Sequence, residues 1–259
     1  MLLPTMTLEE LQKEIDKDSY FLFKQIIKDN KTIIQLSRRF IPYYPHKISR
    51  QVTSPITNIQ YTITIYTPNS YRRANPEYTI YTLYSHDYGS TIIQLVPIDD
   101  RMSYLVFTSH FFKRYKERMK MPSEMSTTDL FEHYRIANTH SAKIEGLIID
   151  NKEKYYHGDD IEYYGAIIAE GAIICERDLQ SPDMIIHNTF ISRDMFFRTQ
   201  DKKSKFAYIV VLFEDFVKNY PRQKQKLEEQ FSIMLQDAER NDEDAEKLFP
   251  KVKSFIDKY

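Results

Sequence analysis

The sequence is poor in glycine, has no tryptophan, and lacks the glycine-rich motifs that bind nucleotides. Only five of its 259 residues are glycine. Dinucleotide-binding loops and P-loops need glycines because their backbone must approach phosphate groups closely. The Gly-x-Ser-x-Gly elbow of serine hydrolases and the His-Glu-x-x-His motif of zinc proteases are absent from the sequence as well. These absences argue against all four classes of enzyme.

Cysteine and long apolar stretches are also scarce. The single cysteine, Cys175, excludes an intramolecular disulfide and fits a reducing compartment. It lies in an apolar run at residues 172–175, so we interpret it as a small core residue rather than a nucleophile. The longest apolar run, residues 207–213, is far shorter than a membrane span requires. The N-terminus has no basic segment of the signal-peptide kind, and we expect a cytoplasmic protein without membrane attachment.

Charge is nearly balanced over the whole chain but unevenly distributed along it. The net charge is −1, yet residues 31–76 contain Lys and Arg and neither Asp nor Glu, whereas residues 237–246 are mostly acidic. Such asymmetry indicates an anionic partner on one surface. We expect this partner to be RNA, and the tyrosines between the basic residues fit either stacking on bases or ordinary strand positions. The candidate nucleic-acid contacts are Arg38, Arg39, Arg72, Arg73 and Lys113.

The periodicity of apolar residues predicts an α+β fold: a mostly antiparallel sheet, a two-helix insertion in the middle and a helical C-terminal part. A capping box of Thr7 and Glu10 opens a helix predicted over residues 7–28, and prolines then break up a loop that extends through Pro55. Strands are predicted at 59–65, 78–85, 90–98, 104–108, 154–157, 162–169, 172–177 and 183–190. The remaining helices are predicted at 109–120, 126–140, 192–199, 206–220, 221–235 and 248–256.

These elements suggest three parts. Residues 1–102 form an N-terminal helix and a basic, tyrosine-rich β layer, residues 103–200 form a central α+β core, and residues 201–259 form C-terminal helices. The last boundary follows from the polar stretch at residues 201–204, which precedes the all-helical part.

The segment from residue 110 to residue 120 sorts its side chains onto three faces if it is helical, at about 100° per residue. An apolar face is expected to dock on the core, and lysines, including Lys113, occupy another face. The third face combines an imidazole, two guanidiniums and a carboxylate, which docking does not require. The apolar face holds Phe111, Phe112, Tyr115 and Met119, and the charged face holds His110, Arg114, Glu117 and Arg118.

The middle of the chain resembles the small BrnT-type toxins and their relatives of the RelE-like fold. The resemblance rests on a strand, the pattern Ser109-His110-x-x-x-Arg114-x-x-x-Arg118, a second helix with a Ser/Thr cap, and a run of hairpin strands. It covers residues 103–195. It implies metal-independent cleavage of RNA, often controlled by a partner antitoxin, and we expect a protein partner of this kind to dock on the C-terminal helices.

The charged face suits such chemistry. Cleavage without a metal needs a base for the 2′-hydroxyl, cations for the phosphorane and an acid for the leaving oxygen. The ordinary pKa of His110 suits either proton transfer, and Arg114 and Arg118 suit forked contacts to phosphate. Glu117 either orients a guanidinium or acts as the base. From the sheet, His187 and Arg177 complete the site if their strands face the helix. The alternative is structural: Glu117 pairs with a neighbouring cation and His110 only precedes the helix.

Neither a cofactor nor a metal is expected. His133 and His140 are seven residues apart on one predicted helix face, but no carboxylate accompanies them, so they make a poor metal site. The run from His157 to Asp160 fits turn chemistry first. The second functional hypothesis is a non-catalytic protein that uses the same fold to bind RNA or a protein partner.

Overall fold

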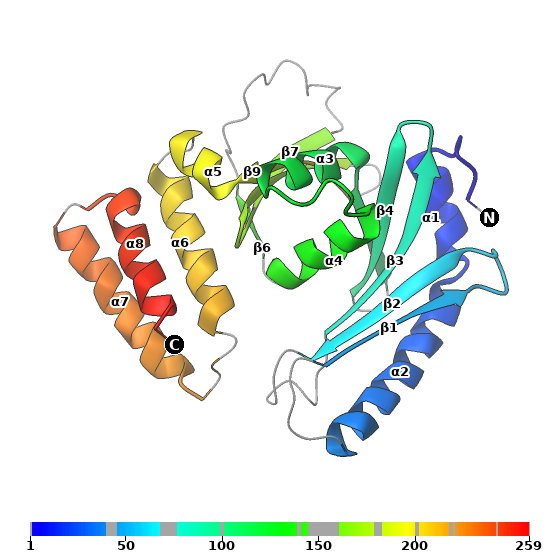
Figure 1. Ribbon diagram of the computed structural model, residues 1–259, viewed down its shortest axis with the longest axis horizontal. Coiled ribbons are helices and arrows are strands. Elements are labelled where there is room, and N and C mark those ends of the chain that lie inside the picture. Colours follow the sequence, from blue (N-terminus) through cyan, green and yellow to red (C-terminus); the bar gives the residue numbers. More distant parts are fainter. Residues whose placement is uncertain are drawn as a thin grey trace. The chain divides into compact units, whose positions relative to one another are not determined.

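The protein folds into helices and mostly antiparallel strands, as the periodicity predicts (Figure 1). The computed structural model describes residues 2–39, 46–67, 77–98, 101–138, 141–144, 161–178, 183–199, 202–217, 220, 222–241 and 243–258. Two compact units divide the chain: Met1–Ser109 with Arg177–Ile186, and His110–Glu176 with His187–Tyr259. The predicted boundaries after residues 102 and 200 differ from this division, in which the C-terminal helices belong to the second unit.

The first unit packs two helices on an antiparallel sheet. The five strands follow one another in the order β1-β2-β3-β4-β5, and each pairs antiparallel with the next. The side chains of Leu11, Ile15 and Leu22 share one apolar cluster with alternate residues of the strands, such as Ile63 and Ile65. This face of the sheet is therefore the core of the unit. The elements are α1 (Leu8–Asp16), α2 (Ser19–Arg39), β1 (His46–Thr53), β2 (Gln60–Thr67), β3 (Glu77–His86), β4 (Gly89–Ile98) and β5 (Arg101–Phe107).

The N-terminal part differs from the prediction in three places, the first being that α2 continues to Arg39, beyond the predicted helix end at residue 28. The capping box at Thr7 is present, with the Thr7 amide donating to Glu10 Oε2 at 2.8 Å, but the predicted single helix is two helices separated at residues 17–18. The predicted loop before Pro55 contains the strand β1. The earlier prolines of that loop, Pro42 and Pro45, lie outside the described residues.

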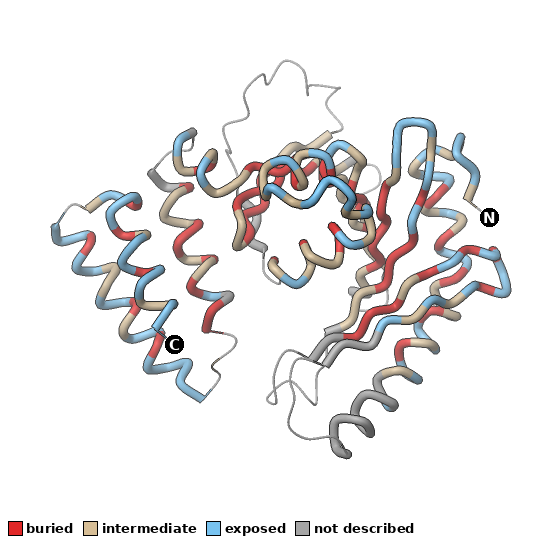
Figure 2. The backbone as a smooth tube through the Cα atoms, in the orientation of Figure 1, coloured by how far each residue is buried: buried red, intermediate tan, exposed pale blue. Residues whose placement is uncertain are grey.

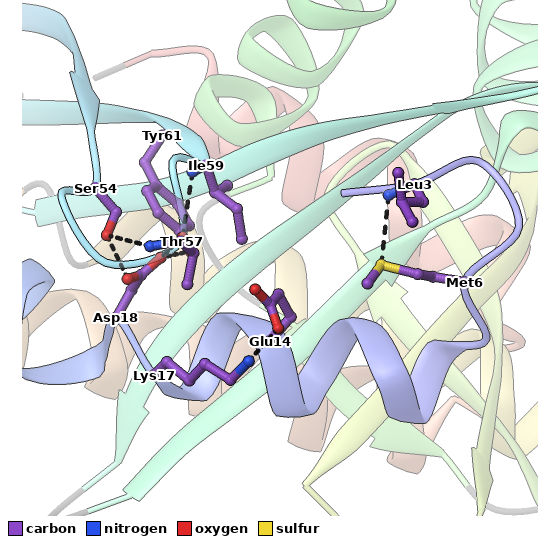
Figure 3. A network of polar contacts seen from close by, with 9 residues as sticks. All are labelled: Leu3, Met6, Glu14, Lys17, Asp18, Ser54, Thr57, Ile59 and Tyr61. Carbon is purple, nitrogen blue, oxygen red and sulfur yellow. Dashed lines mark hydrogen bonds and ion pairs between the residues drawn. The ribbon is translucent and has the colours of Figure 1, made fainter. Parts of the chain in front are cut away.

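A buried carboxylate explains the break between α1 and α2 (Figure 3). Asp18 has no exposed surface. Its oxygens accept hydrogen bonds from the hydroxyls of Ser54, Thr57 and Tyr61, the last at 2.7 Å. Burying a carboxylate is costly unless hydrogen bonds compensate it, so the helix interrupts where Asp18 reaches these donors. The desolvation of Tyr61 and its bond to Asp18 raise the pKa of the phenol far above its ordinary value.

The second unit carries the remaining helices and a sheet in the order β9-β8-β7-β6. The short strand β6 was not predicted, because four residues carry too little pattern to reveal a strand. The strand predicted at residues 154–157 lies outside the described residues. The elements are α3 (Ser109–Arg118), α4 (Thr127–Ala137), β6 (Ser141–Ile144), β7 (Ile161–Ile168), β8 (Gly171–Asp178), β9 (Met184–Ser192), α5 (Arg193–Thr199), α6 (Lys202–Val217), α7 (Lys224–Arg240) and α8 (Ala245–Ile256).

The C-terminal helices pack on one another through an aromatic cluster. The rings of Phe213 and Phe231 stack with centroids 3.9 Å apart and join α6 to α7, and Leu248 of α8 is buried in the same cluster. Buried and exposed positions alternate along α7 and α8, as expected of amphipathic helices (Figure 2). In the described part of the chain, no helix combines the length and apolarity that a bilayer crossing demands.

Candidate functional site

The helix α3 docks through its predicted apolar face. Phe111 and Tyr115 are fully buried, and their rings stack with centroids 5.9 Å apart. Phe190 of β9 lies edge-on to Tyr115 at 5.0 Å, which seats the helix on the sheet. The helix ends at Arg118 rather than residue 120, because Lys120 adopts a left-handed backbone with φ 54°. Met119 therefore lies just beyond the helix, where it is half-buried.

The charged face of α3 remains accessible. His110 is exposed, and the side chains of Arg114 and Glu117 are 41% and 46% exposed. Arg114 Nη1 donates to Glu117 Oε2 at 3.0 Å. Arg118 is half-buried, and its Nη1 atom is buried without a hydrogen-bond partner among the described residues. The face therefore presents one guanidinium held by a carboxylate, that of Arg114, and the half-buried side chain of Arg118.

Partial burial and the charges on this face both favour the neutral imidazole. Partial desolvation lowers the pKa of His110 below its ordinary 6.5, and the cations Arg114, Arg118 and Lys113 lower it further, in that order. Glu117 opposes the shift but does not reverse it. At neutral pH the side chain is therefore an uncharged base beside two cations. Burial and the charge of Arg114 also lower the pKa of Arg118.

His187 does not join this face. It is buried in β9, and its ring lies edge-on to Phe111 with centroids 6.4 Å apart. It therefore lies among the aromatic side chains on which α3 docks, whereas His110 is on the exposed side. The strand of His187 does contact the helix, but it places this imidazole against the apolar face of α3, away from His110, so the predicted role of His187 in the site is not supported.

The predicted nucleic-acid contacts are only partly described. Lys113 is exposed on α3. The side chains of Arg38 and Arg39, and all of Arg72 and Arg73, lie outside the described residues. Arg50, from the same basic stretch, bonds Asp29 Oδ2 through Nε at 2.9 Å and thereby ties β1 to α2. This arginine is structural rather than a contact for an anion.

A polar network behind α3 was missed by the sequence analysis. The hydroxyl of Tyr115 donates to Glu170 Oε2 at 2.6 Å and lies 2.9 Å from Nδ1 of His133. Because a phenol has one proton, Tyr115 accepts from His133, which places a proton on Nδ1. Asn138 also donates to Glu170 Oε2, at 2.7 Å, and its own carbonyl accepts from the Glu170 amide at 3.0 Å.

This network anchors the α3–α4 pair to the turn between β7 and β8. Asn138 is the C-cap of α4, and Glu170 precedes Gly171 in that turn. A side chain at Gly171 would come within 2.0 Å of the Ile191 carbonyl, so only glycine allows the turn to pack so closely. The sequence shows the turn and the cap, but no local signal links two residues that are 32 positions apart.

Two further features bear on function. A pocket of about 450 Å³ opens between α6 and α7, with an apolar lining that includes Phe213 and Phe231 and charged side chains that include Lys224 and Glu228. Among the described residues, no three His, Cys, Asp or Glu side chains are grouped so that they could hold a metal ion. His140 and the run from His157 to Asp160 lie outside those residues.

Comparisons with known proteins add no relative to this picture. No protein-family model matches the chain, and neither a curated protein nor a solved structure matches it. The charged face of α3 must therefore be interpreted from its own chemistry.

Proposed function

We propose that the charged face of α3 binds a phosphodiester of RNA and cleaves the chain without a metal ion. The observation that carries this proposal is His110, an exposed imidazole whose pKa is held below its ordinary value beside two guanidiniums. A neutral imidazole near a cationic phosphate site is the arrangement that a general base for a 2′-hydroxyl requires. The resemblance to RelE- and BrnT-type ribonucleases suggests the same chemistry.

In the proposed reaction, His110 accepts the proton of the 2′-hydroxyl as that oxygen attacks the adjacent phosphorus. The bond from phosphorus to the 5′-oxygen breaks, and the leaving oxygen takes a proton from water. The positive charges of Arg114 and of the half-buried Arg118 stabilise the additional negative charge of the phosphorane. Glu117 orients Arg114 through their ion pair and is not the base.

One observation favours the second hypothesis, a protein that binds RNA without cleaving it. A second imidazole is missing from the described part of this face, because His187 is buried on the other side of Phe111. Binding alone needs only the arginines and Lys113. Docking of a protein partner on the C-terminal helices stays a prediction of the resemblance.

RNA cleavage by the purified full-length protein in EDTA tests the proposal. We expect cleavage by the wild type, a loss of roughly 10²–10⁴-fold in His110→Ala, and a clear loss in Arg114→Lys, since an ammonium cannot make a forked phosphate contact. Lys120→Ala, an exposed lysine just beyond α3, serves as the control and should cleave normally.

The outcomes separate the hypotheses. Cleavage at the wild-type rate by His110→Ala, or its abolition by EDTA, would overturn the mechanism. A wild type that binds RNA through Arg114 and Arg118 but leaves it intact would support the binding protein instead.

A further inference from the structure

The helix α2 exposes an aromatic and cationic surface, which shares no residue with the charged face of α3. Tyr20 is 72% exposed, Phe23 45% and Ile27 48%, although these are large apolar side chains. Lys24 and Lys31 are exposed on the same helix. At about 100° per residue, these five side chains lie within an arc of about 80–100° around the helix axis and extend over about 16 Å along it. We call these five residues the outer face of α2.

The opposite side of α2 is committed to the sheet. Leu22 and Ile26 are buried in the core of the first unit. Asp29, the only acid between residues 19 and 39, points away from the outer face and is bonded to Arg50. The outer face therefore combines positive charge and apolar rings without a neutralising carboxylate of its own helix.

We infer that the outer face of α2 binds single-stranded RNA, with Tyr20 and Phe23 stacking on bases and Lys24 and Lys31 contacting phosphates. Exposed rings next to cations are the features of surfaces that bind single strands, because every base has a flat face and every linkage carries a negative charge. Lys24 already lies over the ring of Tyr20, with Nζ 4.4 Å from the ring centroid, so the charge and the ring are held together.

Two other binding partners, a second copy of this chain and a membrane, fit the outer face of α2 less well. A second copy of this chain would bring the same lysines against one another, which opposes association. A helix that lies in a membrane surface presents a broad continuous apolar face, whereas Leu22 and Ile26 of α2 are buried in the core of the unit and lysines lie between the exposed apolar side chains. The inference rests on the proposed function only in the choice of RNA as the polymer.

Binding is best measured with a fluorescent 2′-O-methyl oligouridine of about 12 nucleotides, within the usual site sizes for single strands. Methylation blocks the 2′-oxygen, so the full-length wild type can be used without cleaving the probe. We expect Tyr20→Ala and Phe23→Ala each to weaken binding at least about five-fold. The double variant Lys24→Gln/Lys31→Gln should also make the slope of log K against log salt less steep by about 1.4, since each contact to a single strand contributes about 0.7.

The controls are an exposed ring and an exposed lysine elsewhere. Tyr88→Ala removes a ring that is 89% exposed at the turn between β3 and β4. Lys226→Gln removes an exposed charge on α7. Neither change should alter binding of the oligonucleotide. Circular dichroism confirms that each variant keeps its helices. Unchanged affinity in Tyr20→Ala and Phe23→Ala, or no binding of the probe at low salt, would overturn the inference.

Phosphatidylserine vesicles test the lipid alternative. Binding to vesicles that Phe23→Ala abolishes, without binding to the oligonucleotide, would reject RNA as the occupant. The proposed function fails separately: a wild type that cannot cleave unmodified RNA, but whose α2 variants lose affinity for the probe, supports this inference and contradicts cleavage.

Discussion

His110 shows how a single residue acquires its properties from the neighbours that its helix provides. Partial desolvation and three nearby cations favour the neutral imidazole, and only Glu117 favours the charged form. These neighbours lie on one helix within about two turns. Burial is the first cause of the lowered pKa, and local spacing along the helix supplies the charged neighbours that add to it.

The pKa of His110 should be measurable by NMR titration of its ring protons. We expect a midpoint below 6.5, so that the imidazole is a neutral base at pH 6.5 and becomes charged only at lower pH. Removing a positive charge stabilises the imidazolium, so Arg114→Gln should raise the pKa. Glu117→Gln should lower it. A midpoint above 6.5 in the wild type, or shifts of the opposite sign, would contradict this account.

At the scale of elements, buried polar groups fix how helices meet strands. Asp18 holds the junction of α1 and α2 against Ser54, Thr57 and Tyr61, while Glu170 holds α3 and α4 against the turn before β8. Each carboxylate gathers donors that are distant in the sequence. Such networks are costly to break, because the remaining partners stay buried without a bond.

Asp18→Ala should lower the free energy of unfolding by about 3 kcal/mol or more, because it leaves three buried hydroxyls without their acceptor. Urea denaturation followed by circular dichroism provides the measurement. Lys17→Ala changes the neighbouring residue, whose exposed amine pairs with Glu14 on the surface, and should change stability by no more than about 0.5 kcal/mol. Equal effects of the two substitutions would contradict the role given to Asp18.

Tyr115→Phe should lower the free energy of unfolding by about 1–3 kcal/mol, because it removes the hydrogen-bond donor to Glu170 and the acceptor for His133. The exposed phenol in Tyr88→Phe is the control and should have almost no effect. Combining Tyr115→Phe with Glu170→Gln should cost less than the sum of the two changes, since the residues share one bond. Strict additivity in the double-mutant cycle would show that this bond contributes nothing.

At the scale of the whole molecule, the chain crosses between its two units three times. The crossings lie after Ser109, Glu176 and Ile186, and they place the end of β8 and the start of β9 in the first unit. Neither unit is therefore a continuous segment of sequence. With a net charge of only −1, attraction to a polyanion must come from local patches rather than from the molecule as a whole.

RNA affinity should accordingly depend steeply on salt and on the basic stretch at residues 31–76. Reversing Arg38, Arg39, Arg72 and Arg73 to Glu should abolish binding at moderate salt. Lys226→Glu with Lys258→Glu reverses two exposed charges elsewhere and should have little effect. Anisotropy titrations at several salt concentrations provide the slopes, and binding that survives the four reversals would reject the stretch as an RNA surface.

The sequence by itself determined those features that depend on neighbours along the chain. The faces of α3 follow from 100° per residue, and the strand pattern of residues 59–65 and the capping box at Thr7 are equally local. This is why the α+β class, most element positions and the grouping of His110 with Arg114, Glu117 and Arg118 were predicted correctly.

Only the tertiary structure decided the features that join distant residues. The break at Asp18 depends on donors 36 to 43 positions away, and the bond from Tyr115 to Glu170 spans 55 positions. The side chain of a strand residue such as His187 can point to either face of its sheet, and the sequence does not say which. Packing against Phe111 placed His187 on the buried face. Packing likewise turned Leu22 and Ile26 of α2 toward the sheet, and so left Tyr20, Phe23 and Lys24 exposed.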